Sequence, residues 1–281
     1  MATRAQYNTG NRMKTVLTLA GSDPLSGAGI QADLQTITQF GGYGLSVISA
    51  INAQNTQGVQ AVFPLPVQQV AAQLDALLSD VDIDAIKLGQ LGSAQTVDLL
   101  VQRLQNQRAP MVLDPVIISS SGRRLLDKSA LAGLLKQLMP LCDLITPNIP
   151  EVNALLQANY HGRAHEMHDI GQAFFDQGIR AILVKGGHSD EQRAVDYLLQ
   201  AGQPMQTFSA PRLKGLNVKG TGCFLSTAIA TLLAQGASLS HAIAHAKQAL
   251  YQGFSQPHRL RHNGTTTTLQ LLHRAPIHTP L

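Results

Sequence analysis

A cysteine placed beside two glycines is the part of this sequence best suited to chemistry. An apolar helical run over residues 221–235 begins at the segment Gly220-Thr221-Gly222-Cys223. The glycines permit backbone angles closed to other residues, so successive N–H groups can point toward one anion at the positive end of the helix. The helix dipole and the neighbouring Lys219 would also favour the thiolate of Cys223, a candidate proton acceptor or nucleophile. Taken alone, the segment fits a glycine-rich helix cap followed by a small buried cysteine equally well.

Oxygen-bearing side chains and one lysine follow other apolar runs. Asp114, Asn148 and Glu151 lie just past two expected strands, and a carboxylate with an amide nearby commonly holds Mg²⁺ through water. Glu151 could equally be a first-turn helix charge, and Asp114 a loop cap. Lys185 ends an apolar run beside two glycines, which suits a cation facing phosphates. An anion site, Mg²⁺ carboxylates, a lysine and a base together predict phosphoryl transfer, although the P-loop pattern G-x-x-x-x-G-K-[ST] is absent.

An earlier glycine-rich segment suggests a ligand loop. Residues 27–32 match the dinucleotide pattern G-x-G-x-x-[GA], but that fold needs an acidic residue about 20 positions further on. No Asp or Glu occurs between Asp33 and Asp75. We therefore expect these glycines to let a small ligand approach the backbone, with Asp33 as a hydrogen-bond acceptor or simply a first-turn helix charge.

A second expected loop, over residues 52–58, is rich in amide side chains and contains Gln54. Amides both donate and accept hydrogen bonds, which suits a neutral heteroaromatic ring. The same composition is also typical of an ordinary turn.

The elements that position these residues alternate between short apolar runs and helical periodicity. Strands are expected at 16–20, 45–51, 85–88, 111–113, 143–146 and 181–184, with a late hairpin over 195–199 and 205–208. Helices are expected at 30–40, 67–78, 94–107, 129–139, 151–158, 167–177, 221–235 and 239–254. The alternation predicts an α/β fold of three layers, α/β/α, with a mainly parallel central sheet. Ligands collect at the carboxyl ends of such strands, where the unusual residues lie.

Charge and cysteine content narrow the class of protein. The net charge is +4, but residues 1–14 and 255–281 hold six of the 21 basic residues and no acid, so the body has 15 basic and 17 acidic residues. A basic face for nucleic acid is therefore not expected. Two cysteines and no long apolar run predict a reduced, cytoplasmic protein that does not span a membrane. We expect residues 1–14 to be a flexible extension and 15–281 to be a single domain.

Seven motifs occur in a fixed order along the chain: Ala20-Gly21-Ser22-Asp23-Pro24, Gly27-Ala28-Gly29-Ile30-Gln31-Ala32-Asp33, Ala53-Gln54-Asn55-Thr56-Gln57-Gly58-Val59, Leu113-Asp114-Pro115-Val116, Thr146-Pro147-Asn148, Val184-Lys185-Gly186-Gly187-His188 and Gly220-Thr221-Gly222-Cys223. In these motifs and their order, residues 15–254 resemble the hydroxymethylpyrimidine/phosphomethylpyrimidine kinases of thiamine biosynthesis. The resemblance implies a ribokinase-like fold, usually dimeric. It also implies that ATP and Mg²⁺ phosphorylate 4-amino-5-hydroxymethyl-2-methylpyrimidine and then its monophosphate.

The same resemblance implies roles for individual residues. Gln54 would bind the pyrimidine ring, helped by Asp33, Gly21, Ala28 and Val116. Asp114 and Glu151 would organise Mg²⁺, and the nucleotide contacts would come from Asn148, Lys185 and His188. Residues 220–223 would form the anion hole, with Cys223 as the base toward the hydroxymethyl group, where sugar kinases of the wider fold use an aspartate.

Four departures from the family pattern bear on the substrate. Leu25 and Ser26 stand where the family usually has Ser and Gly, and Gln90 replaces a methionine that packs near the pyrimidine. Val218-Lys219-Gly220 replaces the common Thr-His-Gly. Phe224 replaces a threonine.

Other functions are also compatible with parts of the sequence. A pyridoxal kinase would share the fold, and Gln90 would alter its ring pocket. The chain could also be a module that binds a pyrimidine without catalysis, but such a module would not need a positioned base such as Cys223. Two histidine groups have spacings that could hold a metal, although solvated or packed imidazoles are the commoner outcome: His161, His165 and His168, and His241 with His245.

Overall fold

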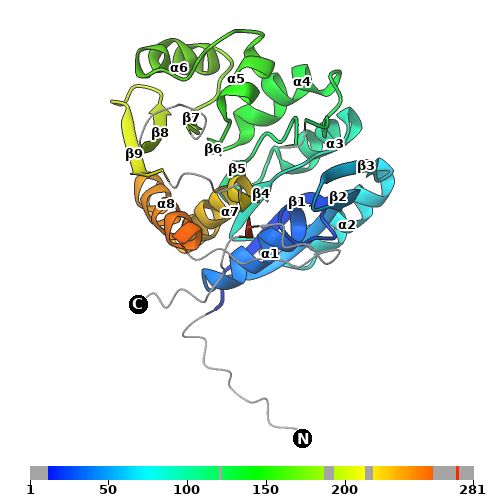
Figure 1. Cartoon of the computed structure of the whole chain (residues 1–281). Helices are drawn as coiled ribbons and strands as arrows, with labels where there is room; N and C mark the ends of the chain where they lie inside the picture. The colour runs from blue at the N-terminus through cyan, green and yellow to red at the C-terminus, as the bar shows by residue number, and fades with distance from the viewer. Residues whose placement is uncertain (1–11, 120–121, 187–192, 213–217, 256–269, 272–281) are drawn as a thin grey trace, which may run out of the picture.

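A nine-stranded sheet forms the centre of the protein (Figure 1). The computed structural model describes residues 12–119, 122–186, 193–212, 218–255 and 270–271. The strands lie in the order β3-β2-β1-β4-β5-β6-β7-β8-β9. Their bounds are β1 (Thr15–Ser22), β2 (Tyr43–Asn55), β3 (Gly58–Pro64), β4 (Ala85–Leu88), β5 (Met111–Leu113), β6 (Leu144–Ile145), β7 (Ala181–Val184), β8 (Arg193–Gln200) and β9 (Gln206–Pro211). Two further short strands, β10 (Val218–Lys219) and β11 (Gln270–Leu271), pair with each other.

The middle of the sheet is parallel and both of its edges are antiparallel. Strands β2, β1, β4, β5, β6 and β7 pair in parallel with their neighbours. At one edge β3 runs antiparallel to β2, and at the other β8 and β9 form a hairpin against β7. The predicted mainly parallel sheet is therefore confirmed, and the carboxyl ends of its six central strands open on one side of the molecule.

Helices cover both faces of the sheet (Figure 1). One face carries α1 (Gly29–Gln39), α7 (Thr221–Ala234) and α8 (Leu239–Ser255). The other carries α2 (Val67–Leu78), α3 (Ala94–Leu104), α4 (Ala130–Gly133), α5 (Ile149–Leu156) and α6 (Met167–Phe175), with the short helical turns η1 (Leu134–Leu138), η2 (Met139–Leu141) and η3 (Ala164–Glu166). This is the expected three-layer α/β/α architecture.

Alternating side chains of each strand divide between the two cores. In β1, Leu17 and Leu19 pack in the core shared with α2 and α3, whereas Val16 packs in the core shared with α7 and α8. All three are at most 1% exposed. Each such side chain contributes about 1.5–3 kcal/mol when fully buried, and a shift of one residue in register would exchange side chains between the two cores and disturb the packing of both.

One expected helix is broken into pieces. The sequence predicts a single helix over 129–139, but α4, η1 and η2 follow one another with different hydrogen-bond spacing. Pro140 lies in the last of these turns and cannot donate a backbone hydrogen bond, so the regular helix ends before it.

The sequence predicts a loop over residues 52–58, and this prediction is wrong. Strand β2 continues through Gln54 to Asn55 and turns back into β3, which the sequence reading did not predict. Gly58 has φ +138°, and the N–H of Gln57 donates to Oδ1 of Asn55 at 2.9 Å, which closes the turn. Gln54 therefore projects from a hairpin strand near the edge of the sheet, because the segments on either side of the turn at 56–57 pair with each other.

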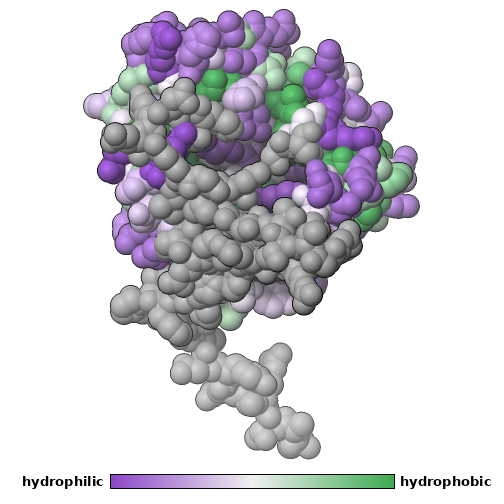
Figure 2. Space-filling model, in the orientation of Figure 1, coloured by the Kyte–Doolittle hydropathy of each residue, from purple (hydrophilic) through white to green (hydrophobic). Residues whose placement is uncertain are grey.

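The described surface seen in Figure 2 is mostly hydrophilic, with hydrophobic residues in separate small groups. Across the described ranges, no helix has the length and apolar character needed to cross a bilayer. Of the expected flexible extension, residues 1–11 lie outside the described part, while Arg12 and Lys14 both contact Asp84, at 2.6 and 3.2 Å. That 15–281 form one domain stays a prediction.

Candidate active site

The turn that opens α7 packs directly on the loop that follows β1. Gly220 has φ +77°, and a Cβ added to it would lie 1.8 Å from the carbonyl oxygen of Gly27. Only glycine can adopt this positive φ and also leave room for the carbonyl oxygen of Gly27. A Cβ on Gly222 would lie 3.2 Å from Asp114 Oδ2 and 3.3 Å from Lys185 Nζ. The turn thus brings Thr221, Gly222 and Cys223 against the carboxyl ends of β5 and β7.

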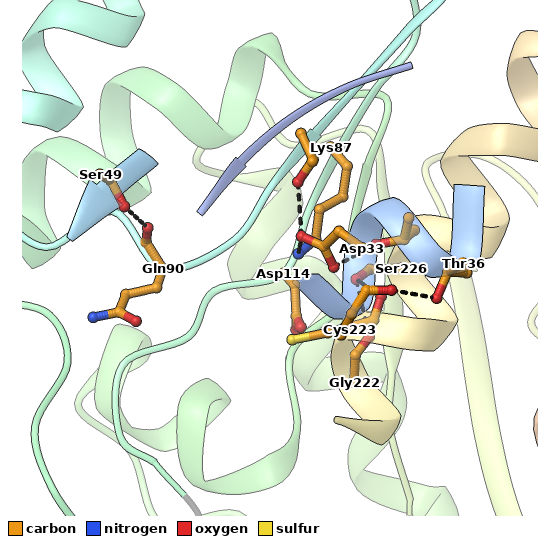
Figure 3. Close-up of polar contacts among 12 residues, drawn as sticks. Asp33, Thr36, Ser49, Lys87, Gln90, Asp114, Gly222, Cys223 and Ser226 are labelled. Carbon is orange, nitrogen blue, oxygen red and sulfur yellow. Dashed lines mark hydrogen bonds and ion pairs between the residues drawn. The ribbon is translucent and has the colours of Figure 1, made fainter. Parts of the chain in front are cut away.

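Cys223 lies in the first turn of α7, next to Gly222 (Figure 3). It is the third residue of α7, and the backbone N–H of Gly29, the first residue of α1, donates to its sulfur. The half-buried thiol therefore receives a donor from α1 and lies within the first turn of α7. Such donors favour the thiolate, in the way that the sequence suggested.

Burial outweighs these donors, and the expected low pKa of Cys223 is wrong. Removal of the thiol from water raises its pKa to about 11, against the opposing charge of Lys87, and Asp33 and Asp114 raise it further. The expected role of Lys219 is also wrong, because its Nζ donates instead to the carbonyl of Asn55 at 3.3 Å.

A buried ion pair of Asp33 and Lys87 lies beneath this turn. Both side chains are 0% exposed, and Lys87 Nζ donates to Asp33 Oδ2 at 2.8 Å. Thr18 Oγ1 donates to the same oxygen at 2.7 Å, and Thr227 Oγ1 donates to Oδ1 at 2.8 Å. Asp33 is therefore corrected from a substrate contact to a positioning residue, because both of its oxygens are engaged inside the protein and no part of it is exposed.

Lys87 was missed as a site residue by sequence reasoning. The charge of Asp33 raises its pKa against the opposing effect of burial, and so do the nearby Cys223 and Asp114. A lysine within an apolar four-residue strand was an available signal, since a charge there needs a buried partner.

Lys185 lies between two carboxylates at the ends of the strands. Its Nζ donates to Asp114 Oδ1 at 2.8 Å and lies 4.0 Å from Glu151 Oε2. These two charges raise the pKa of the lysine against burial. Thr146 Oγ1 also donates to Asp114 Oδ1, at 3.3 Å. The three charged groups predicted from the sequence therefore meet beside Gly222.

Asn148 and Glu151 cap α5 reciprocally. Asn148 Oδ1 accepts from the N–H of Glu151 at 2.9 Å, and Glu151 Oε2 accepts from the N–H of Asn148 at 2.8 Å. Burial raises the pKa of Glu151 to about 7, opposed by the charge of Lys185 and reinforced by that of Asp114. Glu151 thus serves both readings of the sequence, a helix-cap charge and a member of the acidic pair.

The loop after β1 is organised by Asp23, to which the sequence analysis assigned no role of its own. Its carboxylate accepts the N–H groups of Leu25 and Ala28, each at 2.9 Å, and it is 1% exposed. Ser26, at a position where the related family has glycine, adopts φ +57°. That left-handed backbone strains any residue with a side chain.

The remaining residues expected to contact the substrate follow or lie on three strands of the sheet. Gly21 is the penultimate residue of β1, and Val116 is half-buried just beyond β5. Gln54 is half-buried on β2. Gln90 exchanges two hydrogen bonds with the side chain of Asn52, at 2.8 and 3.1 Å. Gln90 therefore adds a paired amide next to Gly21, and Figure 3 shows it apart from Cys223.

The histidine predictions have different outcomes. His188 lies outside the described residues. Where the chain is described, no three His, Cys, Asp or Glu side chains are grouped to hold a metal. His241 and His245 instead meet edge to face, with ring centroids 6.2 Å apart, and His245 meets Phe40 in the same way at 5.7 Å.

Comparison with known proteins agrees with this geometry. Residues 23–268 match the family model of phosphomethylpyrimidine kinase. This chain belongs to the phosphomethylpyrimidine kinase family. It is 44% identical over 241 residues to a hydroxymethylpyrimidine/phosphomethylpyrimidine kinase of Escherichia coli strain K12, covering 85% of this chain and 90% of the relative.

Solved structures of kinases share the fold. A crystal structure of phosphomethylpyrimidine kinase from Clostridium difficile 630 superimposes with a TM-score of 0.74 at 38% identity, covering 85% of this chain and 98% of that one. A pyridoxal kinase from Staphylococcus aureus in complex with pyridoxal gives a TM-score of 0.84 at 26% identity, covering 95% and 96%. The resemblance inferred from the motifs is confirmed, the fold is ribokinase-like, and the chain is an ATP-dependent phosphotransferase.

Proposed function

We propose that this kinase uses ATP and Mg²⁺ to phosphorylate 4-amino-5-hydroxymethyl-2-methylpyrimidine and then its monophosphate, giving the diphosphate used in thiamine biosynthesis. The observation that carries the proposal is the meeting of Asp114 and Lys185 at Gly222, one residue before Cys223. The names of the similar kinases support the same substrate.

Asp114 and Glu151 fit a magnesium ion. Both offer carboxylate oxygens, the ligands that Mg²⁺ prefers, and both already lie within 4.0 Å of one cationic group, Lys185 Nζ. Only two side chains are needed, since Mg²⁺ usually keeps several waters and binds substrate phosphates. When bound, the ion would neutralise phosphate charge.

The residues of the chain act mainly by position and charge. The backbone N–H groups of residues 220–223 would hold the transferred phosphoryl group, and Lys185 would face the phosphates of ATP, with Asn148 and His188 contributing further nucleotide contacts. Because burial raises the pKa of Cys223 to about 11, the free thiolate is scarce at neutral pH. Cys223 can take the hydroxymethyl proton only in this thiolate form, so the thiol would first lose its own proton to solvent; the start of α7, the N–H of Gly29 and the charge of Lys87 favour that loss.

The pyrimidine ring would lie between β2 and the loop after β1. Gln54 would hydrogen-bond its ring nitrogens, and the backbone of Gly21, Ala28 and Val116 would surround it. Asp33 acts on this pocket only through its contacts with Lys87 and Thr227.

A coupled assay of ADP release with the hydroxymethylpyrimidine, its monophosphate and pyridoxal tests the proposal. We expect the two pyrimidines to have the higher kcat/KM. A higher value for pyridoxal would transfer the assignment to a vitamin B6 kinase, which the pyridoxal-bound neighbour makes the second candidate. Binding of the pyrimidines without turnover would indicate a non-catalytic binding module.

We further infer a cytoplasmic homodimer made of one domain per chain. Ile51 and Phe63 face each other across the β2–β3 hairpin and are 42% and 58% exposed, which supports an apolar contact between copies at this edge. Light scattering after size exclusion should give twice the 30.0 kDa chain mass. A mass of one chain at micromolar concentration would contradict the dimer.

A further inference from the structure

A second buried ion pair joins the last helix to the sheet. Lys247, on α8, donates to Asp196 Oδ2, on β8, at 2.5 Å, and the two side chains are only 9% and 8% exposed. A buried ion pair is weak evidence for stability, because the cost of taking two charges out of water offsets much of their attraction. The pair therefore calls for an explanation beyond the packing of α8.

The other oxygen of Asp196 contacts the backbone next to the active site. Asp196 Oδ1 accepts from the N–H of Gly186 at 3.1 Å. A Cβ on Gly186 would lie 1.8 Å from the carbonyl oxygen of Val195, so this turn packs directly on β8. Gly186 immediately follows Lys185, whose Nζ contacts Asp114 at 2.8 Å.

Two sets of contacts thus hold the backbone around Lys185. On its N-terminal side, the N–H of Lys185 donates to the carbonyl of Pro147 at 2.9 Å, and a parallel bridge links it to Asn148. On its C-terminal side, Gly186 is bound to Asp196. Since a lysine side chain has four flexible carbons, the direction of its ammonium depends on how firmly its backbone is held.

We propose that Lys247 is a positioning residue for the nucleotide: its ammonium fixes the carboxylate of Asp196, which fixes the backbone at Gly186 and so the direction of Lys185. The inference rests on the proposed function of Lys185 as the cation that faces the phosphates of ATP. Lys247 acts on the site only through its contact with Asp196.

Lys247→Met tests the proposal with kinetics and with the Gly186 amide. We expect KM for ATP to rise about 10- to 100-fold and KM for the pyrimidine to stay within about 2-fold, because one cationic group is displaced and the ring pocket is not. We also expect faster hydrogen exchange at the Gly186 N–H, followed by NMR. Arg103→Met is the matched control, since it breaks the exposed pair with Asp75 and should change neither quantity.

A double variant, Lys247→Met with Asp196→Asn, keeps the test decisive if the single variant does not fold. It buries no unpaired charge and retains an oxygen that can accept from Gly186. We expect it to fold and still to bind a non-hydrolysable ATP analogue more weakly than the wild type. Wild-type affinity for the analogue and wild-type exchange at Gly186 in this variant would overturn the proposal.

Failure of the proposed function would give a different result. In that case the wild type would turn over neither pyrimidine. The analogue titration and the Gly186 exchange rate would still report whether Lys247 holds the turn beside Lys185.

Discussion

Cys223 shows how the surroundings decide what a residue can do. Its place at the start of α7 and the N–H of Gly29 favour the thiolate, yet burial raises the pKa to about 11. The thiol is therefore mostly protonated at neutral pH, and Cys223 acts as a base only through its minor thiolate form.

Replacement of Cys223 by alanine should lower kcat by about 10²- to 10⁴-fold, the usual contribution of a general base. Affinity for an ATP analogue should change little, because the anion-binding N–H groups remain. Cys142→Ala is the matched control: this cysteine is 1% exposed in the core, its thiol donates to the carbonyl of Leu138, and kcat should be unaffected. Near-normal turnover of the Cys223 variant would exclude the sulfur as the base.

Glu151 should make Mg²⁺ binding depend on pH near neutrality. Its folded pKa, about 7, lies above the ordinary value of 4.5, so protonation below pH 7 removes one negative charge from the metal site. Apparent Mg²⁺ affinity, measured by titration in the presence of an ATP analogue, should fall between pH 8 and pH 6. Glu151→Gln keeps an oxygen for the helix cap and should bind more weakly but with a flat profile over this range.

The same raised pKa has a consequence for stability with a definite sign. Between pH 4.5 and about 7 the folded protein holds a proton on Glu151 that the unfolded chain has released. The free energy of unfolding therefore falls as pH rises through this window. Glu151→Gln should remove this contribution and be more stable than the wild type at pH 8; a loss of stability at pH 8 would contradict the assignment.

At the scale of the elements, the site depends on a contact between two turns. The turn before α7 and the loop after β1 meet where a Cβ on Gly220 would lie 1.8 Å from the oxygen of Gly27. Both turns contribute to the site. The first leads to Cys223, and the second leads to Gly29, whose N–H donates to the sulfur of Cys223.

Gly220→Ala should separate these turns and lower kcat by about 10- to 100-fold, as expected for a displacement near 1 Å. Gly236→Ala provides the matched control at the other end of α7. It has a similar φ, +88° against +77°, but no atom within 4 Å of the added Cβ. The control should lose about 1–2 kcal/mol of stability from its backbone conformation and keep its kcat. Equal kcat in the two variants would show that the contact has no catalytic role.

At the scale of the whole molecule, one buried charge pair links three elements. Asp33 lies on α1, Lys87 on β4 and Thr227 on α7. The side chains of Lys87 and Thr227 both donate to Asp33, and all three residues are 0% exposed. The network holds α1 and α7, the helices that carry Gly29 and Cys223, against the centre of the sheet.

Lys87→Met should lower the free energy of unfolding by about 3–5 kcal/mol, because it leaves the carboxylate of Asp33 buried and unpaired. Urea denaturation measures the change. Adding Asp33→Asn should restore part of the loss, since no unpaired charge then remains while Thr227 keeps its acceptor. If the two changes added independently, the direct coupling of the pair would be refuted.

The sequence by itself determined the parts of this protein that depend on local pattern. Helix α2 lies where its apolar period predicted, and strands β4, β5 and β7 match the short apolar runs. The alternation of these elements led to the three-layer fold, and the ordered motifs led to the family, because both are properties of neighbouring residues.

Only the tertiary structure decided what depends on distant partners. Asp33 became a buried ion-pair member because a lysine 54 positions away lies beneath it. The low pKa expected for Cys223 failed for the same reason: a helix terminus can be read from the sequence, but desolvation by the surrounding layers cannot. The role inferred for Lys247 likewise rests on a carboxylate 51 residues away in the chain.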